Sequence, residues 1–280
     1  MINSLVNLKA DPAITLLRRR FLGYLNDVDL NDGDKASADF LTSEGVLLKP
    51  YSDRLCYRMS SPLVDGLIRT KLLRVLYPLT PPGPPLLRVD RSLDVVETLK
   101  KAVALFDGRH MADSRHMSFK SSGSLAVDSM KKCYVPRESV YDTELMRILT
   151  NWLTPFGWEV IGQWHLLNDS GKHKFTDVTL KGITGQTILF ELVATGTGKD
   201  LDSHIKKVPE YAKLQSATEA WTIHFTCQDN FTPLNVEGAN VLHFVHDLDW
   251  KSVVVYVPWK DHTGCPRLVE EVVVGNAVTK

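Results

Sequence analysis

A run of prolines constrains how this sequence can fold. The segment 79–85, LTPPGPP, holds four prolines in seven residues. Proline has no amide hydrogen to donate and biases the preceding residue toward extended geometry, so neither a helix nor a sheet interior can pass through this run. A stiff linker is the structure that such a composition favours. We therefore predict two domains, at residues 1–79 and 91–280, joined by a proline-rich linker at residues 80–90.

The charge balance and the composition limit the classes of partner. The 280 residues include 33 Lys and Arg and 33 Asp and Glu, so net charge gives no general electrostatic support for nucleic-acid binding, which would need local basic patches. With 44% hydrophobic and 24% charged residues, the composition is typical of a soluble globular protein. The apolar runs are all shorter than the roughly 20 residues of a membrane span, so we expect no membrane partner.

The cysteines and the N-terminal stretch bear on the redox setting and on targeting. Cys56, Cys133, Cys227 and Cys265 lie far apart, without a CxxC pair or a zinc-ligand spacing. Scattered thiols of this kind are typical of reduced, mostly buried cysteines. The stretch MINSLVNLKADP lacks the uninterrupted apolar segment of a secretory signal. We therefore expect neither a disulfide framework nor a signal peptide in this sequence.

The residues before the proline run predict a helix, a hairpin and a second helix. Apolar residues at helical spacing predict an amphipathic helix at residues 14–25. Residues 46–48 and 55–57 flank the turn-prone KPYSDR, which favours a short hairpin. A helix over residues 61–77 begins with a serine suited to the N-cap and a proline in its first turn. This order predicts a small, mainly helical domain of winged-helix type.

The residues after the proline run alternate between helical and strand periodicity. Residues 107–132 are polar and poorly patterned, so we expect a long loop there. Elsewhere the pattern predicts an α/β (α+β) domain with a sheet flanked by helices. The expected helices are residues 93–106, with Ser92 as N-cap, 139–153 and 199–214, and the expected strands are 158–167, 175–180, 186–195, 220–226, 240–248 and 252–259.

Two carboxylates flank a predicted hairpin turn. Asp177 opens one strand, and Glu191 follows fourteen residues later inside the apolar run QTILFELVAT. Between them, KGITGQ carries glycines suited to a hairpin turn, so the strands can pair and bring the carboxylates together. Neighbouring carboxylates repel unless a cation neutralises them or a proton is shared, and they suit Mg²⁺ or Mn²⁺. A metal held in this way activates water for attack on a phosphodiester.

Each carboxylate also has a purely structural interpretation. A glutamate within a buried strand is costly unless it is paired or metal-bound, which makes Glu191 the stronger signal. The alternative for Glu191 is a solvent-facing position at a strand end, paired with Lys181. For Asp177, capping of the strand entry explains the residue equally well. Only the pair, with the hairpin between its members, indicates a metal site.

The pattern of an acidic pair across a hairpin, preceded by a glutamate-bearing helix, resembles the PD-(D/E)xK restriction-endonuclease-like superfamily. The phrases PRESVYDTELMRILTNWL, QWHL, TDVTL, FELVATGT and AWTIHFTCQD, between Val135 and Trp250, are similar to the C-terminal domain of Crinkler-type effector proteins of fungi and oomycetes. YRMSSPLVDGLIR is similar to the winged-helix segment after an AAA-type ATPase in longer members. The resemblance implies a restriction-endonuclease-like mixed sheet, hydrolysis of DNA, and action on DNA or nuclear proteins inside a host cell.

The resemblance also implies roles for individual residues. It makes Asp177 and Glu191 metal ligands for Mg²⁺ or Mn²⁺. It makes Glu144, on the preceding helix, the third carboxylate, with Glu138 as the competitor. The alternative for Glu144 is a surface charge beside Arg147, three positions further along the helix.

The sequence departs from the family pattern at two places. Val193 stands two positions after the glutamate, where the family has a lysine that orients water and stabilises developing negative charge. Lys199 is our catalytic candidate for its replacement, with Lys174 and His204 as alternatives. The second departure is the absence of a Walker A motif, since TGTGKD at residues 195–200 lacks the first glycine and ends in aspartate.

Three functions therefore stay open for the sequence. The first is a Mg²⁺-dependent endonuclease that cleaves DNA. The second is a catalytically inactive nuclease-fold module that binds nucleic acid or a host protein, and the valine in place of lysine is its main support. The third is an assembly fragment whose winged helix docks against an ATPase.

The histidines on predicted strands give weaker signals. His224 stands between apolar residues and is expected to be a core histidine. His243 and His246 are three positions apart and therefore point to opposite faces of a strand, which argues against a shared metal. His165 is expected to be half-buried on its strand, and lining of the active cleft is the alternative.

Overall fold

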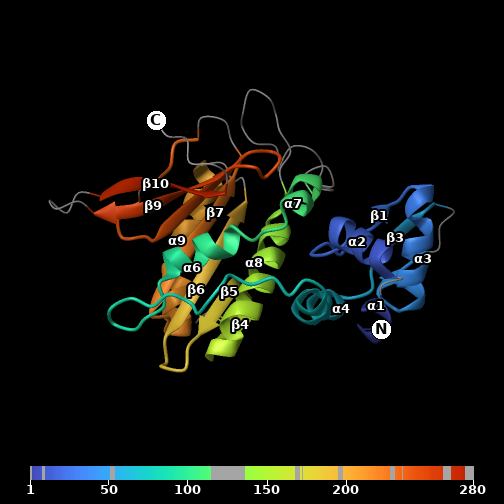
Figure 1. Cartoon of the computed structure of the whole chain (residues 1–280), viewed down its shortest axis with the longest axis horizontal. Coiled ribbons are helices and arrows are strands. Elements are labelled where there is room, and N and C mark those ends of the chain that lie inside the picture. Colours follow the sequence, from blue (N-terminus) through green and yellow to red (C-terminus); the bar gives the residue numbers. More distant parts are fainter. Residues whose placement is uncertain are drawn as a thin grey trace. The chain divides into compact units, whose positions relative to one another are not determined.

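The computed structural model divides into two compact units, Met1–Pro78 and Leu79–Lys280, and each combines helices with a sheet (Figure 1). The structure describes residues 2–7, 10–50, 54–114, 136–167, 171, 173–194, 198–227, 231–234, 236–260 and 266–274, with the backbone alone for 198–200, 259–260 and 266–267. Each unit is described by itself below.

The first unit is a small three-stranded antiparallel sheet with helices, in the strand order β1-β3-β2. The expected hairpin is confirmed, because β2 pairs with β3. The expected helical segment at residues 61–77 is also helical, and Ser61 caps it by accepting a hydrogen bond from Val64 N at 3.1 Å. The elements are α1 (Ile2–Leu5), α2 (Asp11–Arg20), β1 (Val28–Asp29), α3 (Lys35–Ser43), β2 (Leu47–Leu48), β3 (Cys56–Met59), α4 (Pro62–Leu67), a π-helical turn (Ile68–Leu72) and α5 (Leu73–Leu76).

The second unit is built on a seven-stranded mixed sheet in the order β10-β9-β8-β7-β6-β5-β4. The pairs β6–β7 and β7–β8 are parallel, and all other neighbours are antiparallel. The strands are β4 (Glu159–Leu167), β5 (His173–Lys181), β6 (Thr187–Ala194), β7 (Glu219–Thr226), β8 (Val241–His246), β9 (Val253–Lys260) and β10 (Pro266–Val274), and the helices are α6 (Val95–Val103), α7 (Gly108–Ser114), α8 (Glu138–Leu153) and α9 (Gly198–Gln215).

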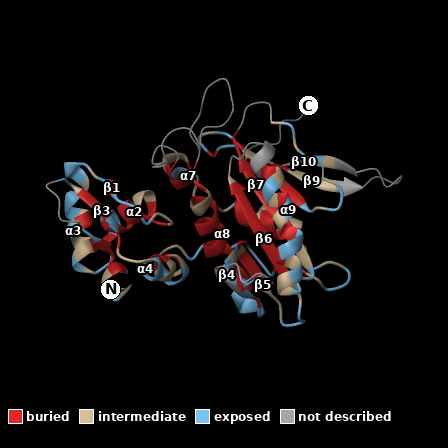
Figure 2. Ribbon diagram, turned by 180° about the vertical axis from the view of Figure 1, so that it is seen from behind, coloured by how far each residue is buried: buried red, intermediate tan, exposed pale blue. Residues whose placement is uncertain are grey.

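Different helices cover the two faces of this sheet. Ile188, Phe190 and Leu192 of β6 belong to the core formed with α6 and α8, whereas Leu189 and Val193 pack against residues of α9. Because successive strand residues point to opposite faces, α8 and α9 lie on opposite sides of the sheet. The buried residues that dominate β6 and α8 are visible in Figure 2. The same alternation places residue 191 on the α9 face.

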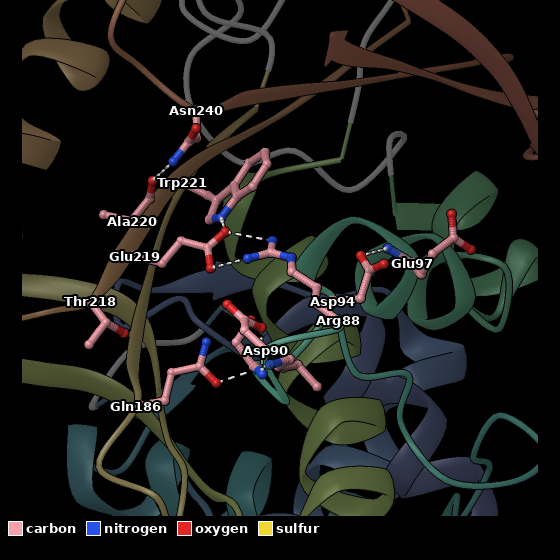
Figure 3. A network of polar contacts seen from close by, with 12 residues as sticks. Arg88, Asp90, Asp94, Glu97, Gln186, Thr218, Glu219, Ala220, Trp221 and Asn240 are labelled. Atoms are coloured by element: carbon pink, nitrogen blue, oxygen red, sulfur yellow. Dashed lines mark hydrogen bonds and ion pairs between the residues drawn. The ribbon is translucent and has the colours of Figure 1, made fainter. Parts of the chain in front are cut away.

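The segment that follows the prolines is bonded to the second unit. Arg88 donates two hydrogen bonds to the Glu219 carboxylate at the start of β7, at 2.9 and 2.8 Å (Figure 3). Leu93 N donates to the Gln186 side chain at 3.0 Å, and Trp152 Nε1 donates to the Gly83 carbonyl at 2.8 Å. Residues 83–93, which belong to the second unit, are therefore held against its sheet and α8.

Several expected elements differ in the structure. Residues 108–114, expected to be loop, form α7, while 115–132 lie outside the described residues. The N-cap of α6 is Asp94, which accepts from Glu97 N at 3.1 Å, because Ser92 bonds to Asp90 instead. The short helix α3 and the strand β10 were not predicted.

Two further expectations concern thiols and membranes. Cys56 and Cys227 are buried and form no disulfide, whereas Cys133 and Cys265 lie outside the described residues. Among the described helices, none has the length and apolar character required to cross a bilayer.

Two histidines on parallel strands are buried in the neutral form. Tyr141 Oη lies 2.8 Å from His246 Nε2, and His246 Nδ1 lies 2.7 Å from the Asp247 carbonyl. A carbonyl only accepts, so Nδ1 carries the hydrogen and Tyr141 donates to Nε2. Burial lowers the pKa of His246 to about 4. Burial and the neighbouring His243 lower the pKa of His224 to about 3, which confirms it as a core histidine.

His243 and His246 face opposite sides of β8, as expected from their spacing. His243 Nδ1 contacts His224 Nδ1 at 3.0 Å, whereas the His246 ring lies tilted against the rings of Tyr141 and Trp250. Each histidine thus belongs to a different layer of the second unit.

These buried imidazoles predict a loss of stability in mild acid. The unfolded chain takes up a proton near pH 6.5, whereas folded His246 does so only near pH 4, so protonation favours unfolding as pH falls between these values. We expect His246 to account for a loss of about 2 kcal/mol between pH 7 and pH 5. Urea unfolding of the wild type and of His246→Asn at both pH values tests this. An equal pH dependence in the two proteins would contradict it.

Candidate functional site

The acidic pair lies on the predicted hairpin. β5 and β6 are antiparallel, with Val178 opposite Phe190 and Lys181 opposite Thr187. Gly182 N donates to the Gln186 carbonyl at 2.8 Å and closes the turn. The hairpin expected from the glycines is therefore confirmed, and it brings Asp177 of β5 beside the end of β6 that carries Glu191.

Asp177 takes the place of a backbone group in the ladder. The regular pairing of β5 with β6 ends at Val178, and Asp177 Oδ2 then accepts a hydrogen bond from Leu192 N at 2.7 Å. This nitrogen belongs to the peptide that joins Glu191 to Leu192, so the Asp177 carboxylate lies directly against the backbone of Glu191. The side chain thereby satisfies a buried amide, as an unpaired donor there would be costly.

At the position of Asp177, the alternation of side chains along β4 is interrupted, so that residues two apart point to opposite faces of the sheet. The ladder pairs Gly162 with Val178 and Trp164 with Thr176, and between these rungs Gln163 has a φ of +53°. Gly162 faces Met146 of α8, whereas Trp164 packs in the cluster with Tyr211 of α9. Beyond Asp177, β4 and β5 therefore continue as a two-stranded ribbon that no longer pairs with β6.

Glu191 is a buried carboxylate with one contacted oxygen. It is 5% exposed, and its Oε1 lies 2.9 Å from His204 Nδ1 of α9. Its Oε2 is buried and has no hydrogen-bond partner among the described residues. The solvent-facing alternative is wrong, because Glu191 is buried and Lys181 instead lies over the Trp164 ring, 3.8 Å from its centroid. A buried carboxylate oxygen of this kind is costly unless a ligand or proton satisfies it.

Tyr211 of α9 lies close to both carboxylates. Burial raises the pKa of its hydroxyl, and the charges of Glu191, Glu210 and Asp177 raise it further. Lys174 of β5 lies over this ring, with Nζ 6.0 Å from its centroid. The two carboxylates thus face one tyrosine on the α9 side of the sheet.

Tyr211 was missed in the sequence, although a signal for it exists. Leu201, Ile205, Val208 and Tyr211 recur at the spacing of one helix face, and all four are buried. The same spacing that identifies the buried stripe of α9 would have identified the tyrosine as a residue facing β5 and β6.

Glu144 does not join the pair. It is fully buried on α8, where its Oε2 lies 2.7 Å from Arg147 Nη2 and accepts from Asp107 N at 3.1 Å. The expected pairing with Arg147 is present, but in the interior rather than on the surface. In the described part of the chain, no three His, Cys, Asp or Glu side chains form a group able to hold a metal ion. Glu138 is the first residue of α8 and is half-buried.

The candidates for the missing lysine are distributed around α9. Val193 is 3% exposed and packs with Leu201, Ile205 and Val241. Lys199 lies in the first turn of α9, and its side chain is outside the described residues. His204 reaches Glu191, as described above, and its side chain is 26% exposed. Of the candidates whose side chains are described, His204 is the one that contacts the acidic pair.

His165 differs from its expected half-buried state. It is exposed on β4 and contacts His173 of β5, with 2.6 Å between His165 Nε2 and His173 Nδ1. It lies on the ribbon beyond Asp177, on the opposite strand face from Trp164 and Leu166, which pack toward α9.

The buried pair of Glu144 and Arg147 predicts strong coupling between the two residues. Glu144→Leu alone leaves a buried guanidinium without its partner and is expected to cost about 3–5 kcal/mol. Replacing both, as Glu144→Leu with Arg147→Met, removes both charges and is expected to cost clearly less than the sum of the single changes. Urea unfolding of the four proteins measures the coupling. Additive effects would show that the ion pair contributes nothing.

The role of Asp177 in the ladder predicts a difference between two substitutions. Asp177→Ala leaves the buried Leu192 amide without an acceptor and is expected to cost about 1–3 kcal/mol. Asp177→Asn keeps an acceptor oxygen in place and should retain most of that stability. Unfolding free energies from urea titration test the difference. Equal losses in the two variants would contradict the hydrogen bond as the cause.

Comparison with known proteins finds no match: no family model, no curated protein and no solved structure is similar to this chain.

Proposed function

We propose that this protein is a metal-dependent endonuclease that hydrolyses DNA at Asp177, Glu191 and His204. The observation that carries the proposal is the buried Glu191 carboxylate, whose Oε2 has no partner among the described residues, beside Asp177 on the neighbouring strand. The order α8, β4, β5, β6, α9, β7 supports it, because a helix, three antiparallel strands, a crossover helix and a parallel strand resemble a restriction-endonuclease-like core.

The two carboxylates fit a hard divalent cation. Mg²⁺ is usually held by one or two protein carboxylates and keeps several waters, so the absence of a third described ligand is compatible with it. Among the residues that the structure describes, Glu191 Oε2 is buried without a partner, which is the state expected of an oxygen that binds a ligand. We infer that Asp177 and Glu191 hold Mg²⁺ or Mn²⁺. When bound, the cation supplies an activated water and offsets the charge of a phosphodiester.

His204 takes the role that the family pattern gives to the lysine. An ionised carboxylate only accepts hydrogen bonds, so His204 Nδ1 donates to Glu191 Oε1. In a neutral ring Nε2 then carries a lone pair and can take a proton from water, as a base oriented by a carboxylate. The His204 side chain is partly exposed, so the ring is not closed off from a substrate. Lys174, beside Tyr211, adds positive charge for a phosphate group.

The inactive nuclease-fold module stays the second candidate. Val193 is the observation that favours it, because this position is packed in an apolar cluster and offers no charge to a substrate. A protein of this class would bind nucleic acid or a host protein without turnover. Calorimetry with Mn²⁺ helps to distinguish the two candidates. The active site proposed here requires metal binding that depends on Asp177 and Glu191, whereas an inactive module does not.

Nicking of supercoiled plasmid DNA in the presence of Mg²⁺ tests the proposal. Glu191→Gln and Asp177→Asn should each lower the rate at least about 100-fold, and His204→Asn by about 10²–10⁴-fold, the range for loss of a general base. Asp202→Asn is the matched control, because Asp202 is an exposed acid on α9 paired with Lys206, and its rate should equal the wild type. Equal rates in all variants would show a contaminating nuclease. Metal binding without cleavage in the wild type would favour the inactive module.

A further inference from the structure

Two exposed histidines meet on the ribbon formed by the outer parts of β4 and β5. His165 Nε2 and His173 Nδ1 are 2.6 Å apart, and the two rings are stacked with centroids 4.8 Å apart and planes 16° from parallel. Phe175 lies next to His165, with 5.1 Å between the ring centroids. Both imidazoles are exposed, and neither takes part in the contacts of the acidic pair.

The backbone holds the two rings in this position. His165 is paired with Phe175, and His173 with Leu167, so the histidines stand on a diagonal of one antiparallel ladder. Diagonal neighbours on one face lie within reach of aromatic side chains. The strand register therefore places the two nitrogens close together.

We propose that His165 and His173 form a surface site for a divalent transition-metal ion that prefers imidazole ligands. Nitrogen ligands stand about 2.0–2.1 Å from such an ion, so two that are 90° apart lie about 2.9 Å from each other. The observed separation needs to widen by a few tenths of an ångström, and the rings must turn so that both lone pairs point at the ion instead of at each other. Two histidines supply two positions, and water fills the others. Among divalent ions, Cu²⁺ binds such a site most tightly, above Ni²⁺ and Zn²⁺.

Binding requires a specific protonation state of the pair. In the hydrogen bond between the rings, one of the two facing nitrogens carries the hydrogen and the other accepts. A metal ion needs both facing nitrogens bare, so the donating ring must move its hydrogen to its other nitrogen. The neutral pair can do this without a net loss of protons.

The site is chemically distinct from the proposed catalytic one. Asp177 and Glu191 offer oxygen ligands, which suit hard ions such as Mg²⁺, whereas the ribbon offers two imidazoles. The ribbon site therefore does not depend on the proposed function. Mg²⁺ is not expected to compete with Cu²⁺ for the histidines.

Titration of the full chain with Cu²⁺, followed by calorimetry and electron paramagnetic resonance, tests the proposal. The wild type should give a spectrum with nitrogen hyperfine structure from two imidazoles. His165→Asn and His173→Asn should each weaken this binding by about tenfold or more, and the double variant should lose it. Phe175→Leu keeps both imidazoles on the same ladder and should retain the two-nitrogen spectrum.

Thermal unfolding provides a second readout that detects misfolded variants. Without metal, the variants should unfold at nearly the wild-type temperature, since both side chains are exposed. Added Cu²⁺ should raise that temperature for the wild type and Phe175→Leu only, because binding to the folded state stabilises it. Equal affinity and the same spectrum in the wild type and the double variant would overturn the proposal.

Discussion

The contact between Glu191 and His204 is the interaction on which the arrangement of the α9 side of the sheet depends. A carboxylate inside β6 is costly to bury, and a hydrogen bond to it comes from the helix that follows the strand. Because β6 and β7 are parallel, α9 must cross over between them and pack on one face of the sheet. The crossover that the topology requires is therefore also what brings an imidazole to the carboxylate.

Asp177 lies both beside Glu191 and at the point where β5 stops pairing with β6. Its side chain bonds to the Leu192 amide where the β5–β6 ladder ends, and across from it Gln163 adopts a left-handed conformation. Beyond this position β4 and β5 pair only with each other, as a two-stranded ribbon, and their side chains have switched faces. A residue that binds metal in the proposed mechanism thus also marks the point where the sheet gives way to the ribbon carrying His165 and His173.

Elements with a strong periodic pattern could be predicted from the sequence. Short elements without a clear period, and contacts between residues far apart in the sequence, could not. The β5–β6 hairpin and α8 follow from glycine placement and from apolar spacing, and both are present. The helix α7 has seven residues and β10 mixes two glutamates with valines, so neither gives a clear period. His204, which contacts Glu191, was only one of three candidates for the missing lysine, because the choice among them depends on how α9 lies along β6. Glu144 likewise accepts a hydrogen bond from Asp107 N, which directly precedes α7, a helix that was not predicted.

The absence of the lysine at Val193 follows from the packing of α9. Val193 lies on the same face of β6 as Glu191, but it is enclosed by Leu201, Ile205 and Val241. A lysine there would place an ammonium group in an apolar cluster, at a cost that only a nearby carboxylate could offset. His204 reaches the same carboxylate from the helix while its side chain stays partly exposed. In the proposed mechanism, His204 of α9 therefore takes the role that the resemblance assigns to a lysine on the strand, and no ammonium group needs to be buried beneath the helix.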